Sequence, residues 1–152
     1  MDKFTPKDKL IYKDLSYKII GVLFEVSNEL GFGYQERYFE EAVAKGLKLK
    51  DLRFQRQICY KLTYKDQIIG TFRLDFLVEN LIVLEIKTGK RFAKKDFDQV
   101  KAYLKATGTQ LAIMAIFTNE GVRFYRVLNL NNEIKQTEAT IDTSKLKKII
   151  NL

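Results

Sequence analysis

The order of helical and strand patterns along the chain predicts an α/β domain with a mixed β-sheet flanked by helices. Two helical patterns come first, three strand patterns follow, and a helix and two more strands complete the order. The length of 152 residues fits one domain, and 46% hydrophobic residues are sufficient to build its core. We therefore expect a single domain over residues 1–152, in which residues 1–12 form a charged, loosely held leader.

The helices are predicted from apolar residues that recur at helical spacing. The first covers residues 14–30 and ends at Gly31, because a glycine after the last periodic residue is typical of a helix end. The second runs from about residue 35 to residue 49, and the third covers residues 96–107. A last short helix is expected after residue 143.

The strands are predicted from alternating or continuously apolar segments that are separated by turn residues. They cover residues 54–64, 71–78, 81–87, 111–117 and 122–128. The fourth of these segments is apolar throughout, which is typical of a strand that is buried on both faces.

The absence of histidine limits the chemistry that this chain can perform. It excludes Ser-His-Asp and Cys-His catalysis, HNH-type nucleases and His-ligated zinc. The single Cys59 excludes cysteine-rich zinc sites and an internal disulfide, which fits a reducing cytoplasm. Hydrolysis would therefore depend on carboxylates, Lys, Tyr, Ser or Thr, and a bound metal would be a hard ion such as Mg²⁺ or Mn²⁺.

The charge of the chain favours a polyanionic partner. A net charge of +8 and a pI near 9.5 are typical of proteins that bind nucleic acid or an anionic membrane surface, although a basic protein without such a partner has the same composition. No apolar run reaches transmembrane length, and the N-terminus lacks the apolar stretch of a secretory signal. We expect a cytoplasmic protein with nucleic acid, and no membrane, as its partner.

Three ionisable residues interrupt two strands that are otherwise strongly apolar. Asp75 lies in the second predicted strand, and Glu85 and Lys87 lie in the third, where alternation puts both on one face. Asp75 shares a face with Leu77 and lies opposite Glu85 if the hairpin loop holds an odd number of residues. Because unpartnered buried charges are costly, a divalent cation between the two carboxylates would explain the pattern; an ion-paired strand edge is the alternative.

The residue types suit phosphate chemistry. Two carboxylates can hold a hard cation that stabilises charge on a phosphate and activates a water, and a neighbouring lysine can position that water or stabilise the developing oxyanion. The same tripeptide recurs as Glu133-Ile134-Lys135, but without an aspartate on a preceding apolar strand. We predict that this second copy lies in a solvated loop, so it serves as an internal control.

Four segments, taken in order, resemble a known family. They are Gly33-Tyr34-Gln35-Glu36-Arg37-Tyr38-Phe39, Phe72-Arg73-Leu74-Asp75, Leu84-Glu85-Ile86-Lys87 and Gln99-Val100-Lys101-Ala102-Tyr103-Leu104-Lys105-Ala106-Thr107-Gly108. Over about residues 14–117 the chain resembles the GxxExxY proteins of the PD-(D/E)XK nuclease superfamily. Phe39 takes the place of the last tyrosine in the signature and keeps its ring without the hydroxyl.

The resemblance implies an αβββαβ restriction-endonuclease-like core. In that core Asp75 and Glu85 are the metal ligands and Lys87 is the catalytic lysine. It also implies that Glu36 is the additional acidic residue of RecB-like nucleases. From the residues alone, Glu36 is equally explained as a carboxylate at the start of a helix, where the helix dipole favours it.

The resemblance further assigns Gln99 and Tyr103 to the QxxxY motif of the RecB-like branch. They are four residues apart and share a helix face, so without the resemblance they are explained as surface residues. A cluster of basic residues beside the predicted site is expected to contact phosphates, with a solvated charge run as the alternative. Its members are Lys90, Arg91, Lys94 and Lys95.

The leading hypothesis is a metal-dependent nuclease that cleaves DNA, with RNA left open. Two alternatives are an inactive nuclease-like module that binds nucleic acid, and a protein-interaction module that uses the helix at residues 15–30. Since the sequence shows no appended recognition domain, we also expect that a protein partner directs targeting, and a homodimer stays open.

Overall fold

The computed structural model describes residues 11–130 and 133–139, and confirms the α/β class with a mixed sheet. Its elements are α2 (Lys13–Leu30), α3 (Glu36–Leu49), β1 (Phe54–Tyr64), β2 (Gln67–Val78), β3 (Ile82–Thr88), α4 (Lys94–Thr107), β4 (Leu111–Thr118), β5 (Gly121–Leu130) and β6 (Glu133–Ala139). The predicted leader, up to residue 10, and the predicted C-terminal helix lie outside the described residues. In the described part, no helix is long and apolar enough to cross a bilayer.

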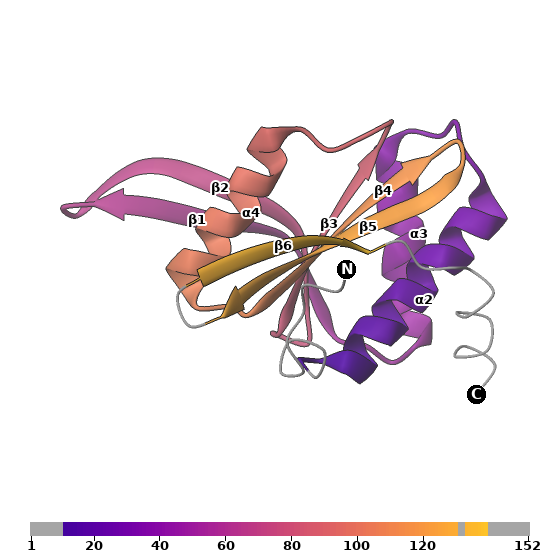
Figure 1. The fold of residues 1–152 in the computed structure, drawn as a ribbon, viewed down its shortest axis with the longest axis horizontal. Coiled ribbons are helices and arrows are strands. Elements are labelled where there is room, and N and C mark those ends of the chain that lie inside the picture. The colour runs from indigo at the N-terminus through magenta and orange to yellow at the C-terminus, as the bar shows by residue number, and fades with distance from the viewer. Residues whose placement is uncertain (1–10, 131–132, 140–152) are drawn as a thin grey trace.

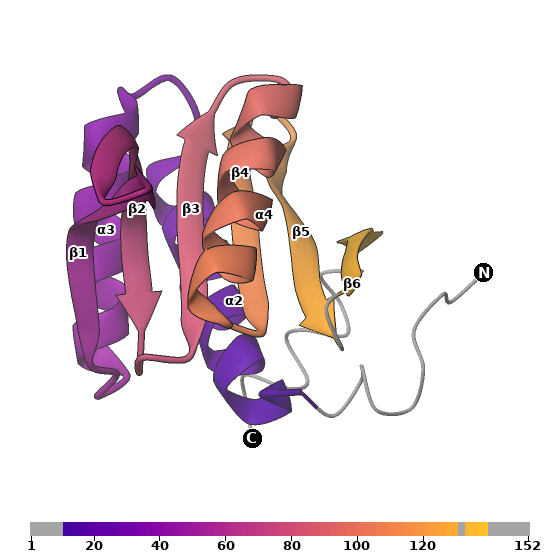
Figure 2. The ribbon, with the colours of Figure 1, turned by 90° about the vertical axis from the view of Figure 1, so that its left-hand side faces the viewer.

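One six-stranded sheet, in the order β1-β2-β3-β4-β5-β6, forms the centre of the fold. The pairing of β3 with β4 is parallel and every other pairing is antiparallel, because the helical crossover α4 connects β3 to β4. Figure 2 shows α4 on one face of the sheet and α2 with α3 on the other. The chain therefore forms three layers, with strands in the middle.

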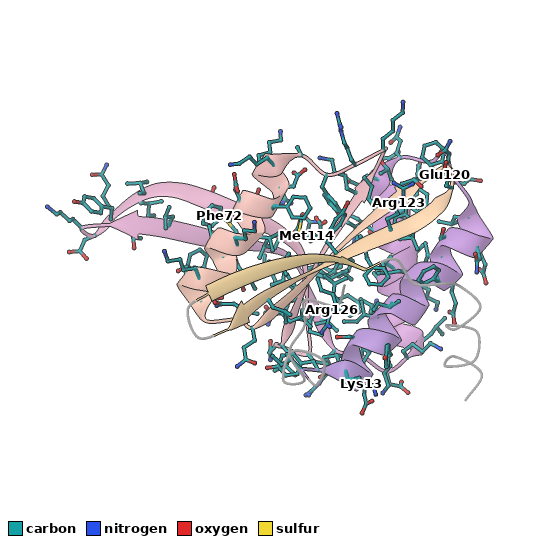
Figure 3. All side chains as sticks on the ribbon, viewed as in Figure 1. Lys13, Phe72, Met114, Glu120, Arg123 and Arg126 are labelled. Carbon is teal, nitrogen blue, oxygen red and sulfur yellow. The ribbon has the colours of Figure 1, made fainter. Side chains whose placement is uncertain are left out.

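Apolar side chains fill the space on both sides of the sheet. The α2/α3-side cluster includes Ile19, Leu23, Phe39, Phe76 and Leu84, all fully buried. The α4-side cluster is smaller. Its buried members include Leu74, Val83, Val100, Leu104 and Met114, the last of which is labelled near the middle of the molecule in Figure 3. Strand β4 is buried at every position, as its continuous apolar pattern predicts.

Two predictions about the strands were wrong. The solvated loop predicted for Glu133-Ile134-Lys135 is instead the start of β6, which pairs with β5. Asn129 and Leu130, from the polar stretch that suggested a loop, themselves belong to β5 and pair with β6. An outer antiparallel strand tolerates polar positions because one of its faces can meet water. Strand β2 also begins at Gln67, four residues before the predicted start at residue 71, because pairing with β1 continues past Gly70 to the end of the hairpin.

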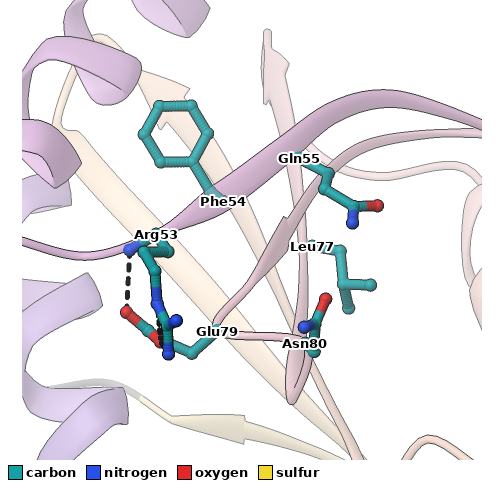
Figure 4. Close-up of a pocket in the computed structure, with 6 residues that line it drawn as sticks. All are labelled: Arg53, Phe54, Gln55, Leu77, Glu79 and Asn80. Carbon is teal, nitrogen blue, oxygen red and sulfur yellow. Dashed lines mark hydrogen bonds and ion pairs between the residues drawn. The ribbon is translucent and has the colours of Figure 1, made fainter.

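The hairpin between β2 and β3 has the odd loop that the sequence analysis required. Val78 pairs with Ile82, so three residues form the connection. Glu79 in this loop accepts hydrogen bonds from the Arg53 backbone N–H at 2.7 Å and from the Arg53 guanidinium at 3.2 Å (Figure 4). The loop is thereby fixed to the start of β1, where these bonds continue the pairing of β1 with β2.

We expect Gly46→Ala to destabilise the protein by about 1 kcal/mol. A Cβ at Gly46 of α3 would lie 2.5 Å from a methyl carbon of buried Val22 in α2, so one helix must move. Over-packing of this kind costs ~1–3 kcal/mol, and the better helix propensity of alanine returns ~1 kcal/mol. Urea unfolding measures the difference. In a Val22→Ala background the same change should cost less, and a net gain of stability in the Val22 protein would contradict the close contact.

Candidate active site

The carboxylates of Asp75 and Glu85 lie side by side on neighbouring strands. The Ile86 backbone N–H donates to Asp75 Oδ2 at 2.7 Å, and the Asp75 backbone N–H donates to Glu85 Oε1 at 2.9 Å. The paired β2–β3 register ends at Phe76 and Leu84, one residue before this point. Each side chain therefore bonds to the backbone of the opposite strand where the ladder stops, which holds both carboxylates in place.

Strand β2 turns over at Asp75. Leu74 and Leu77 both pack with the α4-side cluster, although simple alternation would put them on opposite faces, and Phe76 packs with the α2/α3-side cluster. On β1, Gln57 has a φ of +52°, and the register passes from the Arg56–Phe76 pair to the Ile58–Leu74 pair without pairing Gln57 and Asp75. This irregularity breaks the alternation around Asp75, so period-two spacing alone does not decide whether Asp75 shares a face with Leu77.

On β3 the alternation holds. Val83 packs in the α4-side cluster, and the Lys87 ammonium reaches the Asp96 carboxylate of α4 at 2.8 Å. Glu85 lies between these two positions in the alternation. This face of β3 therefore packs against α4, and it carries the Glu85 carboxylate and the Lys87 ammonium two residues apart.

Burial and mutual repulsion shift the acidic groups toward their protonated forms. Burial raises the pKa of Glu85 to about 8, and the charge of Asp75 adds to the effect. Burial also raises the pKa of Asp75, against the opposing effect of the hydrogen bond from Ile86. Two crowded carboxyl groups with raised pKa values are typical of a site that binds a positive charge.

Glu40 of α3 is a site residue that the sequence analysis missed. Its carboxyl shares a hydrogen bond with Asp75, and burial together with that bond raises the pKa of Glu40 to about 7. The available signal was its spacing, because Glu36 and Glu40 are four apart and share a helix face.

Glu36 lies at the start of α3, within electrostatic range of the same group. The loss of hydration around its carboxyl raises the pKa of Glu36, Glu40 adds to the effect, and Lys87 opposes it. The side chain is largely exposed. The structure thus brings Glu36 near the site, and it brings Glu40 into contact with Asp75.

Asp96 links the lysine to the start of α4 and was also missed. Besides the Lys87 ammonium, its Oδ2 accepts the backbone N–H of Ala93 at 2.8 Å, which caps the helix. Although burial alone would raise it, these two hydrogen bonds hold the pKa of Asp96 below its ordinary value. The carboxylate is therefore a stable negative partner for Lys87.

The two residues of the predicted QxxxY motif occupy different surroundings. Gln99 Nε2 donates to the backbone carbonyl of Arg73 at 2.9 Å, two residues before Asp75. Tyr103 is buried in the α4-side cluster, with its ring edge-on to Tyr60 at 5.6 Å between centroids. The structure therefore places Gln99 beside the site and Tyr103 in the core behind it.

The predicted basic cluster surrounds the loop from β3 to α4. Lys90, Arg91, Lys94 and Lys95 are all exposed. Lys94 pairs with Asp98 at 2.8 Å along the helix surface, an exposed contact that contributes little to stability. The loop directly follows the strand that carries Glu85 and Lys87.

The donor set fits a hard divalent cation. Carboxylate oxygens are the ligands that Mg²⁺ and Mn²⁺ prefer, and Asp75 and Glu85 each commit only one oxygen to the backbone. Among the described residues, no three acidic, His or Cys side chains already converge in a metal-holding arrangement. The Asp75–Glu85 pair is the part of this acidic group whose remaining oxygens could hold such an ion.

Comparison with known proteins identifies the family of this chain. The family model described as the PD-(D/E)XK nuclease superfamily matches residues 13–127, which is most of the chain. A solved structure named "Crystal structure of SSO0001" aligns at 14% identity with a TM-score of 0.45; the alignment covers 92% of this chain and 65% of that one. A search of curated proteins finds no significant match. On the family match, which covers α2 through most of β5, this chain belongs to the PD-(D/E)XK nuclease superfamily.

Proposed function

We propose that this chain is a nuclease that hydrolyses phosphodiester bonds of DNA and depends on Mg²⁺ or Mn²⁺. The observation that carries the proposal is the reciprocal placement of Asp75 and Glu85 across two strands, with Lys87 two residues farther along. Membership of the superfamily and the net charge of +8 support a nucleic acid substrate. RNA has the same reacting group and is the second substrate to test.

Each residue near the pair has a role that its contacts suggest. Asp75 and Glu85 would hold the cation, which when bound supplies charge stabilisation and lowers the pKa of a water. Lys87, oriented by Asp96, would stabilise negative charge on the phosphate. Glu40, in contact with Asp75, would complete the acidic group.

Both alternative functions have less support. An inactive binding module has no need to keep two partly buried carboxylates with raised pKa values beside an oriented lysine. An interaction module built on α2 would need an exposed apolar stripe, but Ile19, Val22 and Leu23 are fully buried against the sheet and α3. A targeting partner, a homodimer and a cytoplasmic location stay predictions.

Asp75→Asn should abolish cleavage, because it removes one charge from the pair that would hold the cation. The assay incubates purified protein with circular and linear, single- and double-stranded DNA in Mg²⁺ or Mn²⁺. The cation should also raise the melting temperature of the unchanged protein more than that of the variant.

Glu85→Ala should act like Asp75→Asn. Glu133→Ala, in the second Glu-Ile-Lys copy, should keep activity and change stability by no more than ~0.5 kcal/mol. Equal loss of activity in both glutamate variants would refute the assignment.

Three glutamates of α3 allow a matched comparison. Glu40→Gln should lower cleavage by about 10- to 100-fold, since Glu40 contacts a ligand of the proposed cation. Glu36→Gln should lower it less, and Glu41→Gln should leave it unchanged, because Glu41 pairs with Arg56 at 2.8 Å on the surface. Rates at saturating cation distinguish the three. A larger loss in Glu36→Gln than in Glu40→Gln would show that the carboxylate at the helix start completes the site.

The cation-free protein should lose stability as the pH rises from about 5 to 8. The pKa values of Glu85 and Glu40 are about 8 and about 7 in the fold, against 4.5 as the ordinary value. In this window the folded state holds protons that the unfolded state has released. Unfolding therefore releases protons, so a rise in pH favours the unfolded state. Denaturation in EDTA at several pH values measures the slope, and Glu85→Gln should flatten it. A wild-type slope equal to that of Glu85→Gln would contradict the shift.

A further inference from the structure

The hairpin formed by β1 and β2 extends well beyond the three layers, as the long pair of strands on the left of Figure 1 shows. We call its outer part, residues 59–73, the arm. Every residue from Thr63 to Ile69 is exposed, and the two strands stay paired up to Tyr64 and Gln67. The arm is therefore a two-stranded ribbon that is largely exposed to solvent.

The two faces of the arm differ in chemistry. On one face the Tyr60 and Phe72 rings are stacked, with centroids 6.3 Å apart, and Tyr60 packs against Tyr103 of α4. The other face, which we call the polar face, consists of Cys59, Lys61, Thr71 and Arg73, all exposed. In the register, Cys59 lies opposite Arg73 and Lys61 lies opposite Thr71, so the four residues form one compact patch.

The polar face carries cations that no acid neutralises. Within the described residues, neither Lys61 nor Arg73 forms an ion pair, whereas Lys87 and Lys94 both do. The only acidic residue between positions 59 and 73 is Asp66, at the tip. An unneutralised basic patch on a ribbon is complementary to a polyanion.

The polar face ends close to Asp75 along β2. Arg73 is two residues before Asp75 on the same strand, a rise of about 7 Å. Gln99 holds the Arg73 carbonyl at 2.9 Å, so the base of the arm is fixed to α4 beside the site. A polymer that lies along the polar face would therefore pass close to Asp75.

We propose that the polar face of the arm lies in the major groove of double-stranded DNA and guides the duplex to the carboxylates. A groove about 12 Å wide admits a two-stranded ribbon, whereas the deep, narrow major groove of an RNA duplex does not. Lys61 and Arg73 would contact phosphates, and Thr71 would donate a hydrogen bond to the backbone or to a base edge. What happens to the DNA at the carboxylates rests on the proposed nuclease function; the binding itself does not.

The test measures binding without cleavage. In an Asp75→Asn background, fluorescence anisotropy reports the affinity for a DNA duplex, the corresponding single strand and an RNA duplex, each over a range of salt concentrations. Lys61→Ala with Arg73→Ala should weaken duplex DNA binding at least tenfold and reduce the salt slope by about 1 for each cation. Lys61→Arg with Arg73→Lys should keep the binding. Lys45→Ala with Lys48→Ala removes the same charge from the exposed side of α3 and should change it little.

Each outcome decides one question. Equal affinities for the arm variant and the α3 variant would overturn the arm as the DNA contact and leave the nuclease proposal intact. An equal loss for duplex and single strand, or for DNA and RNA duplexes, would overturn the groove assignment. A change in oligomeric state by sedimentation, with DNA binding retained, would show that the arm joins two copies instead. Arm-dependent binding by a wild-type protein that cleaves no substrate would support the arm and end the nuclease proposal.

Discussion

Between β2 and β3 the backbone ladder stops at Phe76 and Leu84, and two carboxylates continue the pairing. This exchange of side-chain for backbone hydrogen bonds satisfies the amides of Asp75 and Ile86 while the strands begin to separate. It places both acids at the point where the sheet opens toward α3 and α4. The arm, the lysine of β3 and the acidic residues of α3 all take their positions relative to this point.

The same arrangement works against stability. Partial burial raises the pKa values of both Asp75 and Glu85, and the charge of each carboxylate repels its neighbours in the acidic group. The rest of the fold offsets this cost through the fully buried β4 and the two apolar clusters. A rigid apolar sheet thus supports a small polar region, as is common where a local arrangement serves binding and not packing.

Much of the framework could be predicted from the sequence because helix and strand periodicity are local signals. The three helices and the centres of five strands follow from spacing alone, and Asp75 and Glu85 stood out because they interrupt apolar strands. Glu40 and Asp96 could not be separated from other acidic residues on helix surfaces, since their importance depends on contacts across the fold. The turnover of β2 at Asp75 and the sixth strand were missed because a local backbone irregularity and an outer strand have no strong periodic pattern.

Asp96 shows how closely architecture and chemistry are joined here. One carboxylate oxygen caps the first turn of α4 and also holds the ammonium of Lys87. A substitution at Asp96 would therefore change both the partner of Lys87 and the start of the crossover helix. Because a short acidic side chain is needed for both contacts, we expect this position to vary less among relatives than the exposed acids beside it, even though the sequence gives no motif to mark it.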